Sequence, residues 1–309
     1  MCAARIRSTA PDFVVTERLD IEFTGDGEHD WLRIEKTGAN TTWVAGQLAR
    51  AASVHIRDVG YAGLKDRHAV TRQWFSVRRP SGSTTDWSAV TIDGVEILDI
   101  EHHRRKLKRG THSGNTFRIA LRGEDLVSVT HAFSERIQQI TVGGVPNYFG
   151  EQRFGRNGSN VELGESVLAG KKMSRNKRSI GISALRSLHF NNELGERVKN
   201  DTWNKVLPGD TMNLDGTNSV FDVEDATDDL RERCERLDIH PTGILPAFQH
   251  IGVETSRRAL RMRARGIEWE LANDTIWLEF ELGKGCFATA VLREIIRYAP
   301  ESNGLRGSI

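Results

Sequence analysis

The sequence predicts a mixed α and β fold, in which a strand-rich domain is interrupted by a mainly helical segment and completed by the C-terminal part of the chain. Apolar and polar residues alternate over 115–122 and again over 276–282, as in strands with one buried face. After Gly143 and Gly144 the pattern becomes mainly helical as far as about residue 265. The two strand-rich regions are therefore expected to form one domain on either side of an insertion.

Each predicted element rests on a local pattern. The strongest helix signal lies at 126–140, where five apolar residues follow one another at spacings of three and four. Asn40 or Thr41 can serve as the N-cap of an earlier helix. Proline and glycine indicate turns at 208–210 and 241–243. We predict strands over 13–17, 31–35, 73–78 (half-buried), 115–122 and 276–282, and helices over 40–54, 126–140, 159–169, 179–198, 227–237 and 288–298.

The composition is that of a globular protein outside the membrane. The 309 residues suffice for one large domain or two of ordinary size. With 38% hydrophobic and 28% charged residues, the chain has no apolar run near the roughly 18 residues of a membrane span. Residues 1–7 lack the apolar segment of a signal peptide, so we expect a cytoplasmic location. Cys2, Cys234 and Cys286 are too scattered for a disulfide framework or a metal clasp.

The net charge of +1 arises from basic and acidic clusters that nearly cancel. Basic residues concentrate at 102–109, 171–178 and 257–265, and acidic residues at 222–238. Such clusters can hold a polyanion locally despite overall neutrality. The alternative interpretation is that each cluster is a solvated helix face.

Two segments stand out as carriers of chemistry. The loop 60–71 (GYAGLKDRHAVT) combines glycines with ionisable groups between two predicted strands, where reactive side chains are often placed, and it makes Asp66 a candidate. The alternative is a charged turn that is only solvated. The tract 146–155 (PNYFGEQRFG) has no period, which indicates a domain junction or a binding turn.

Five segments, in order, resemble the signature motifs of TruD-type tRNA pseudouridine synthases. They are 62–71 (AGLKDRHAVT), 114–117 (GNTF), 146–155 (PNYFGEQRFG), 176–179 (NKRS) and 283–294 (GKGCFATAVLRE), and they span nearly the whole chain. The resemblance implies an α+β pseudouridine synthase fold, with a central and mainly antiparallel sheet interrupted by a mainly helical TruD-specific insertion. It places the catalytic domain at 1–143 and 262–309 and the insertion at 144–261.

The resemblance also implies an activity and site residues. The expected reaction is isomerisation of uridine in tRNA, with uridine 13 as the usual bacterial target, by a monomeric enzyme. Asp66 resembles the family's catalytic aspartate. Phe13, Asn115 and Phe287 fall where the family contacts the target nucleotide, and Phe117 falls at an aromatic position beside that site. Arg7 stands where the family often has a lysine, so it preserves a charge partner for Asp66 with different reach and geometry.

This chemistry needs few groups. The bond from uracil N1 to ribose is broken and C5 is joined to the same carbon, so nothing is oxidised and we expect no cofactor and no metal. One ionised carboxylate suffices, whether it attacks the ribose carbon, adds to the uracil ring or removes a sugar proton. The three alternatives remain open. Gly283-Lys284-Gly285 is too short for a phosphate loop, and the ten histidines lack metal-ligand spacing.

Binding an extruded base requires compensation for its lost stacking. The faces of Phe13, Phe117 and Phe287 can stack on the base, and Asn115 can read the uracil edge. Basic residues are expected to contact phosphates without reading the base sequence. The expected phosphate contacts are Lys65, Arg67, Arg104, Arg105, Lys106, Lys108, Arg109, Lys171, Lys172, Arg175, Lys177 and Arg178.

Two other functions compete with this interpretation. A non-catalytic RNA-binding protein on the same fold would not need the intact Lys65-Asp66-Arg67 segment. An aspartate-dependent hydrolase of a small molecule would need a second carboxylate or a histidine at suitable spacing, and the sequence offers neither. The sequence therefore favours the RNA isomerase.

Overall fold

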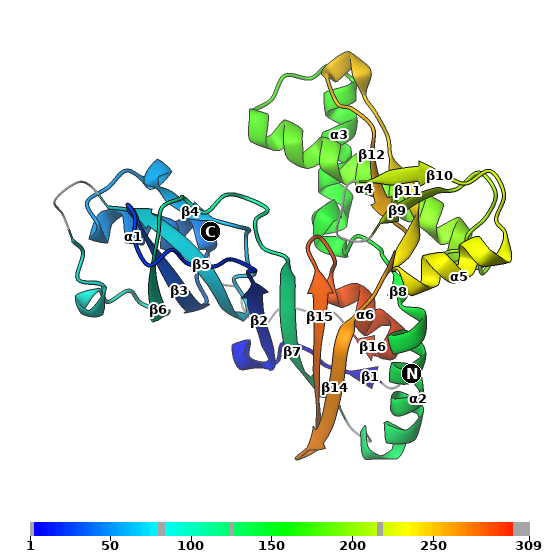
Figure 1. Cartoon of the computed structure of the whole chain (residues 1–309), viewed down its shortest axis with the longest axis horizontal. Coiled ribbons are helices and arrows are strands. Elements are labelled where there is room, and N and C mark those ends of the chain that lie inside the picture. Colours follow the sequence, from blue (N-terminus) through cyan, green and yellow to red (C-terminus); the bar gives the residue numbers. More distant parts are fainter. Residues whose placement is uncertain (1–2, 80–83, 124–125, 215–218, 299–309) are drawn as a thin grey trace. The chain divides into compact units, whose positions relative to one another are not determined.

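The computed structural model describes residues 3–79, 84–123, 126–214 and 219–298. The chain forms two compact units (Figure 1). The first unit comprises 1–135, 265–285 and 295–309, and the second comprises 136–264 and 286–294. The second unit thus includes most of the last helix in addition to the predicted insertion. The limits of the insertion domain, between residues 143 and 144 and between residues 261 and 262, stay a prediction.

A large sheet forms the centre of the first unit. Its strand order is β14-β15-β7-β2-β5-β3-β6, with β4 paired to β5 beside this path. All strand pairs are antiparallel except β2 with β5, so the predicted mainly antiparallel sheet is confirmed. The strands are β2 (Phe13–Arg18), β3 (His29–Thr37), β4 (Val59–Tyr61), β5 (Val70–Arg78), β6 (Val95–His103), β7 (Gly114–Arg122), β14 (Arg265–Ala272) and β15 (Thr275–Gly283).

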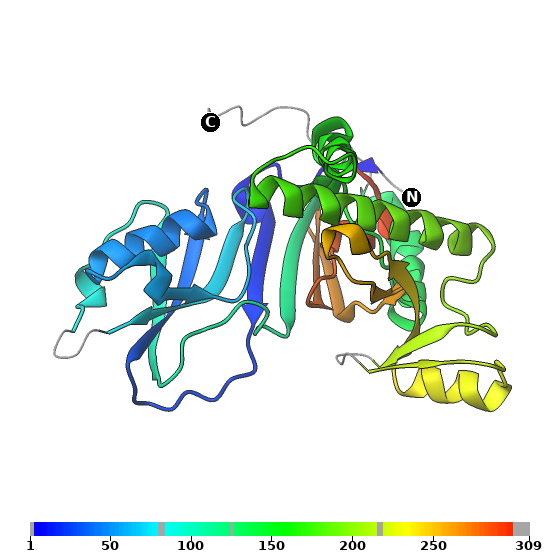
Figure 2. The same cartoon turned by 90° about the horizontal axis from the view of Figure 1, so that it is seen from above.

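Helix α1 (Thr41–Ala51) covers one face of this sheet (Figure 2). Its buried residues Val44 and Leu48 pack with Phe75 and Val77 of β5. Asn40 is the N-cap by its extended backbone, although its side chain accepts no capping hydrogen bond. The spacing of apolar residues in the sequence therefore corresponds to a contact between the helix and the sheet.

Strand β5 is buried on both faces, which corrects the predicted half-buried strand. Phe75 faces the core below α1, while Trp74 packs on the opposite face with Trp31 and Leu107. The strand lies between β2 and β3 in the sheet and both of its faces are covered. Its polar residues Gln73 and Ser76 are buried with it.

Shorter elements complete the first unit. The 3-10 helix η1 (Ala10–Asp12) leads into β2, and η2 (Ile56–Asp58) leads into β4. Strands β1 (Ala3–Ala4) and β16 (Arg297–Tyr298) pair in parallel. The predicted helix 288–298 therefore ends early, because α6 covers Ala288–Ile295 and β16 follows. The predicted helix at 126–140 corresponds to η4 (Leu126–Val129) and α2 (Thr130–Gly143).

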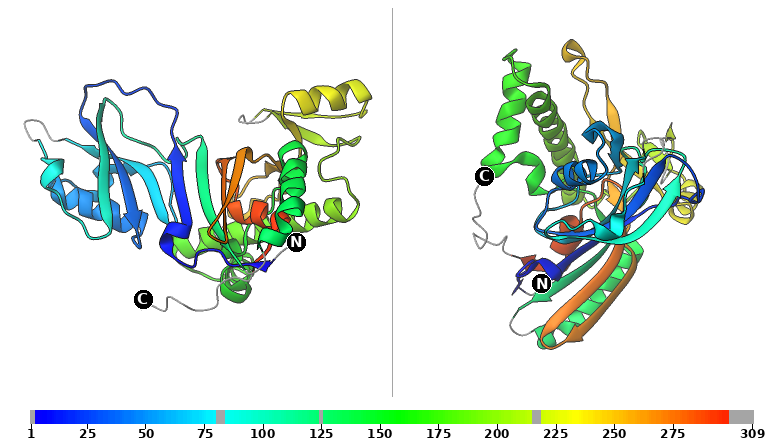
Figure 3. Two further views of the ribbon diagram at one scale, coloured as in Figure 1. Left: turned by 90° about the horizontal axis from the view of Figure 1, so that it is seen from below. Right: turned by 90° about the vertical axis from the view of Figure 1, so that its left-hand side faces the viewer.

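The second unit combines helices with a small sheet. Its helices are α2 from residue 136 onward, α3 (Ser159–Leu168), α4 (Arg175–Lys199), α5 (Asp228–Arg236) and all but the last residue of α6. Helix α4 begins four residues before the predicted start, since the Ser174 side chain caps it by accepting from the Lys177 N–H. Figure 3 shows α3 and α4 side by side in green. The strand order is β10 (Val220–Asp222), β9 (Thr211–Leu214), β11 (Ile239–Leu245) and β12 (Ser256–Ala259), and β8 (Val145–Pro146) pairs with β13 (Arg261–Met262).

The predicted turn at 241–243 is wrong, because these residues lie inside β11. Pro241 is the last residue that pairs with β9, and Thr242 is the first that pairs with β12. Proline can stand at this change of partner because it donates no hydrogen bond to either strand. Gly243 is needed for packing, since an added Cβ would lie 2.9 Å from the Phe190 ring of α4.

Candidate active site

The loop that carries Asp66 connects β4 to β5. Its backbone is held by two polar side chains of the surrounding elements. Thr41, the first residue of α1, accepts from the Lys65 N–H at 3.0 Å and donates to Gln73 at 3.0 Å. Gln73 in turn donates its amide to the Gly63 carbonyl at 3.2 Å. The loop therefore has a defined conformation on a rigid scaffold.

Both carboxylate oxygens of Asp66 have a donor. Oδ2 lies 2.9 Å from Nη2 of Arg7, and Oδ1 accepts from the His68 N–H at 3.0 Å. The side chains of Arg7 and Asp66 are 24% and 22% exposed. The predicted pairing of these two residues is thus present in a position that an external molecule can reach.

Arg7 is held in an unusual conformation. Its backbone φ is +62°, in the left-handed region that residues other than glycine rarely adopt. Its guanidinium carbon lies 4.1 Å from the centroid of the Phe13 ring, and Nε is buried without a hydrogen-bond partner. Strained backbone of this kind is found where tertiary contacts determine it, often at functional sites.

Lys36 supports the same loop from β3. Its side chain is fully buried, and Nζ donates to the carbonyls of Asp66 at 2.9 Å and Ala39 at 2.8 Å. Burial lowers the pKa of Lys36 to about 8, while the Asp66 charge opposes that shift. Sequence reasoning missed this residue, because a lysine in a strand ordinarily faces solvent.

Lys65 does not serve the role predicted for it. Its Nζ lies 2.8 Å from Glu17, and the two side chains are 5% and 0% exposed. A buried cation that is paired with a carboxylate cannot reach an RNA phosphate, so the expected phosphate contact is corrected to a structural ion pair. Glu17 also accepts from the Trp74 N–H at 3.2 Å, which ties β2 to β5.

Phe13, Asn115 and Phe117 lie on one face of the sheet. In the β2–β7 pair Phe13 is opposite Ile119, Val15 is opposite Phe117 and Glu17 is opposite Asn115. The Oδ1 atom of Asn115 is buried without a hydrogen-bond partner in the described structure. This amide oxygen can therefore accept from the N3–H of a bound uracil.

The two phenylalanines are core residues in this structure. Phe13 and Phe117 are 3% and 7% exposed and meet edge to face at a centroid distance of 6.2 Å. Arg7 covers Phe13, and Phe280 stacks on Phe117 at 5.5 Å. The expectation that both rings offer a free stacking face is thus corrected, because both rings are buried in the core. The contact of Phe13 with Arg7 gives Phe13 a positioning role, and Phe117 supports Phe13 from the side.

Phe287 belongs to the second unit, where it packs with Phe149 at a centroid distance of 5.9 Å. The guanidinium of Arg258 lies 5.8 Å from the Phe287 ring. Since Asp66 belongs to the first unit, the expected contact of Phe287 with the target nucleotide stays a prediction.

The basic cluster at 102–109 is partly neutralised. Arg104 makes a forked hydrogen bond with Asp26, and Arg109 stacks over Tyr61 at 3.9 Å. Lys106 donates to the Arg57 carbonyl. Among the described residues the side chains of Arg105 and Lys108 have no partner, and both are exposed. The latter two are the free cations of this cluster.

The remaining predicted phosphate contacts are all exposed. Arg67 donates to the Gly38 carbonyl at 2.9 Å in the first unit. In the second unit Arg178 donates to the Ile251 carbonyl at 2.8 Å. The other four predicted contacts are Lys171, Lys172, Arg175 and Lys177. Their side chains have no hydrogen-bond or ion-pair partner among the described residues.

Neither a metal cluster nor a membrane span is found in the described part of the chain. No three His, Cys, Asp or Glu side chains over these ranges lie close enough to hold a metal ion. No described helix is long and apolar enough to cross a membrane. Cys234 is buried and Cys286 is half-buried, neither in a disulfide bond, while Cys2 lies outside the described residues.

This chain is similar to known proteins in both sequence and structure. A model of the family described as tRNA pseudouridine synthase D (TruD) matches residues 1–174 and 245–295. A relative from Methylococcus capsulatus, named tRNA pseudouridine synthase D, is 41% identical, and the match covers 97% of this chain and 93% of the relative. One of the same name from Aeromonas hydrophila is 37% identical with the same coverage.

The solved structure of a putative tRNA pseudouridine synthase D (TruD) from Methanosarcina mazei superposes with a TM-score of 0.73 at 19% identity, over 95% of this chain and 93% of that one. This likeness confirms the predicted pseudouridine synthase fold. From the matches in sequence, the chain belongs to the TruD family. The predicted enzyme class, an RNA pseudouridine synthase, is thereby confirmed at the level of the family.

Proposed function

We propose that this protein isomerises uridine to pseudouridine in tRNA, at uridine 13, with Asp66 as its catalytic carboxylate. The observation that carries the proposal is the Arg7–Asp66 pair. Asp66 lies in a loop fixed by Lys36, Thr41 and Gln73, and the pair is accessible from outside. The family membership of the chain supports tRNA as the substrate.

The chemistry asks one carboxylate to help break the bond between uracil N1 and the ribose carbon, after which the same ribose carbon forms a bond to C5. Asp66 meets this requirement, because it is held by Arg7 and the His68 N–H in a defined orientation. The proton lost from C5 balances the proton gained at N1, so the reaction needs no oxidant or imported group. A single carboxylate oxygen can attack the ribose carbon, add to the uracil ring or remove a sugar proton.

Recognition of the base is assigned to Asn115. Its free, buried Oδ1 accepts from N3–H of uracil, whereas cytosine has an acceptor at N3 and is rejected. Phe13 keeps Arg7 in place beneath the base. Exposed Arg105 and Lys108, with the free cations of the second unit, are assigned to the phosphates.

Tritium release tests this function directly. With tRNA carrying uridine labelled with tritium at C5, the wild type is expected to release label and Asp66→Asn is expected to lose at least about 10³-fold in rate. Asp66→Asn keeps the size of the side chain, so tRNA affinity is expected within about twofold of the wild type. A tRNA with cytidine at position 13 is expected to give no release.

Two outcomes would contradict the proposal. Full activity of Asp66→Asn would remove the assigned residue from the chemistry. A wild type that binds tRNA but releases no tritium would favour the alternative, a non-catalytic RNA-binding protein on this fold.

A further inference from the structure

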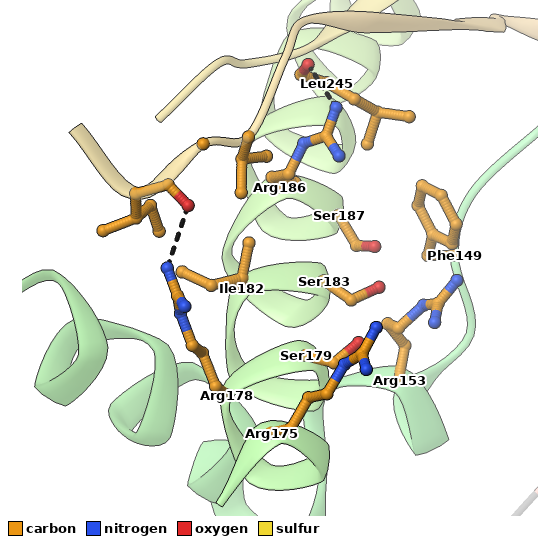
Figure 4. Close-up of a pocket in the computed structure, with 13 residues that line it drawn as sticks. Phe149, Arg153, Arg175, Arg178, Ser179, Ile182, Ser183, Arg186, Ser187 and Leu245 are labelled. Carbon is orange, nitrogen blue, oxygen red and sulfur yellow. Dashed lines mark hydrogen bonds between the residues drawn. The ribbon is translucent and has the colours of Figure 1, made fainter. Parts of the chain in front are cut away.

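A cavity of about 580 Å³ in the second unit lies along α4 and is rich in arginine (Figure 4). Its volume lies within the range of sites that bind small organic groups, roughly 300–1,000 Å³. Four arginines contribute to its wall together with three serines. They are Arg153, Arg175, Arg178 and Arg186, with Ser179, Ser183 and Ser187.

The spacing of these residues along α4 explains how they come together. Ser179, Ser183 and Ser187 follow at intervals of four residues, so they lie one above another on a single helix face, as Figure 4 shows. Arg175 and Arg186 stand near the two ends of this row. Arg153 reaches the cavity from the 3-10 helix η5 (Glu151–Phe154), which belongs to the family motif at 146–155.

The positive charge of this cavity is not compensated. No acidic residue is among the described residues that line it. The guanidinium groups of Arg153 and Arg175 have no hydrogen-bond or ion-pair partner in the described structure, and Nε of Arg153 and of Arg186 is buried without one. Burial alone lowers the pKa of Arg153 and of Arg186.

The other two arginines are bonded only by neutral groups. Arg178 donates to the Ile251 carbonyl at 2.8 Å, which is drawn as a dashed line in Figure 4. Arg186 donates to the carbonyls of Leu245 and Glu254 at 2.9 Å and to the Ser256 hydroxyl at 2.7 Å. These contacts orient both side chains without neutralising the charge of either. The cavity is therefore suited to binding an anion.

We propose that this cavity, which is lined by residues of the second unit, binds the sugar-phosphate backbone of the RNA substrate, one nucleotide with its phosphate. Guanidinium groups match phosphate oxygens in forked pairs, and the serine row offers hydroxyls to the ribose. No side-chain amide or carboxylate is among the described lining residues, and the proposal assigns the arginines to phosphate oxygens. The identity of the ligand as RNA rests on the proposed function.

The binding of tRNA tests this site. We would measure the dissociation constant of the full-length protein for tRNA across a series of KCl concentrations, for the wild type and for Arg153→Gln, Arg175→Gln and the double variant. Each lost phosphate contact is expected to weaken binding several-fold and to reduce the salt slope by about 0.7–1. In tritium release, KM is expected to rise more than kcat falls.

A matched control is Arg236→Gln on α5, an exposed arginine of the same unit outside this cavity. It removes the same charge and is expected to leave the affinity and salt slope close to wild type. Arg175→Lys keeps the charge without the fork and is expected to restore part of the affinity. Arg175 is exposed, so its variants test the site without threatening the fold.

The proposal is overturned if the Arg153 and Arg175 variants bind tRNA with wild-type affinity and salt slope. It is also overturned if adenosine monophosphate binds the wild type and is lost in these variants while tRNA affinity is unchanged, since the cavity would then hold a free nucleotide. Failure of the proposed function is distinguishable, because it shows as an absence of tritium release by the wild type, whatever the binding data.

Discussion

At the scale of single residues, the Asp66 loop depends on charges that the sequence places far apart. Arg7 precedes the first long strand, Lys36 lies one residue before the end of the second, and both converge on Asp66, one on its carboxylate and one on its carbonyl. Lys65, although adjacent to Asp66, turns inward to Glu17. Proximity in sequence therefore did not decide which cation serves the catalytic candidate.

The pKa of Lys36 gives a pH dependence of stability. Because burial lowers this pKa from 10.5 to about 8, between these values the unfolded chain holds a proton that the folded chain has released. The contribution of Lys36 to the free energy of unfolding therefore rises with pH across this window and is constant below it. We expect the wild type to gain stability relative to Lys36→Met as the pH is raised from 8, measured by urea denaturation.

A second part of the Lys36 contribution to stability does not depend on pH. Lys36→Met also leaves the Asp66 and Ala39 carbonyls without their donor, a cost of about 1–3 kcal/mol that is independent of pH. A difference in the free energy of unfolding that stays flat from pH 7 to pH 10 would contradict the assigned pKa. An exposed lysine such as Lys172 serves as the control and is expected to show no such window.

At the scale of elements, helices α3 and α4 approach closely through a pair of glycines. A Cβ on Gly164 would lie 2.4 Å from the Gly181 carbonyl oxygen, and a Cβ on Gly181 would lie 2.5 Å from the Gly164 nitrogen. Both distances are far below van der Waals contact with rigid backbone. The position of α3 on α4, the helix that carries the arginine-rich cavity, thus requires glycine at both positions.

Alanine at this crossing is expected to destabilise the protein. Gly181→Ala would separate the helices at a cost of about 1–3 kcal/mol, which exceeds the roughly 1 kcal/mol gained from the helix propensity of alanine. Gly195→Ala on the same helix is the matched control, since its nearest neighbour is the Tyr148 hydroxyl at 3.8 Å. Thermal denaturation should lower the Tm of Gly181→Ala and leave that of Gly195→Ala unchanged or higher. Equal Tm shifts would contradict the close approach.

At the scale of the whole molecule, a chain of net charge +1 must bind a polyanion through local clusters. The structure separates free cations from paired ones within a single cluster. Arg105 and Lys108 are exposed and unpartnered among the described residues, whereas Arg104 is held by Asp26, whose hydrogen bonds raise the pKa of Arg104.

Neutralising the free cations is therefore expected to matter more for RNA binding. The double variant Arg105→Gln and Lys108→Gln should weaken tRNA binding about tenfold and reduce the salt slope by 1–2. Arg104→Gln removes a charge that Asp26 already offsets, so its effect should be smaller. The measurement is the dissociation constant for tRNA at several KCl concentrations. An equal effect per charge at Arg104 would show that pairing with Asp26 is irrelevant to binding.

Much of this protein was determined by its sequence alone. Strands β7 and β15 follow from alternation, and the helix that contains Phe133 follows from spacings of three and four, because these periods belong to consecutive residues. The five ordered motifs were sufficient to identify the TruD family and its fold.

Other features were decided only by the tertiary structure. The sheet of the second unit escaped prediction, and Pro241 and Gly243, which resemble a turn, lie in its strand β11. The burial of Lys36 and Lys65, and the gathering of Arg153 with Arg186 around one cavity, have no local signature. The physical reason is that periodicity reports which face of an element is apolar, whereas the partner of a charged side chain is set by residues that only folding brings near.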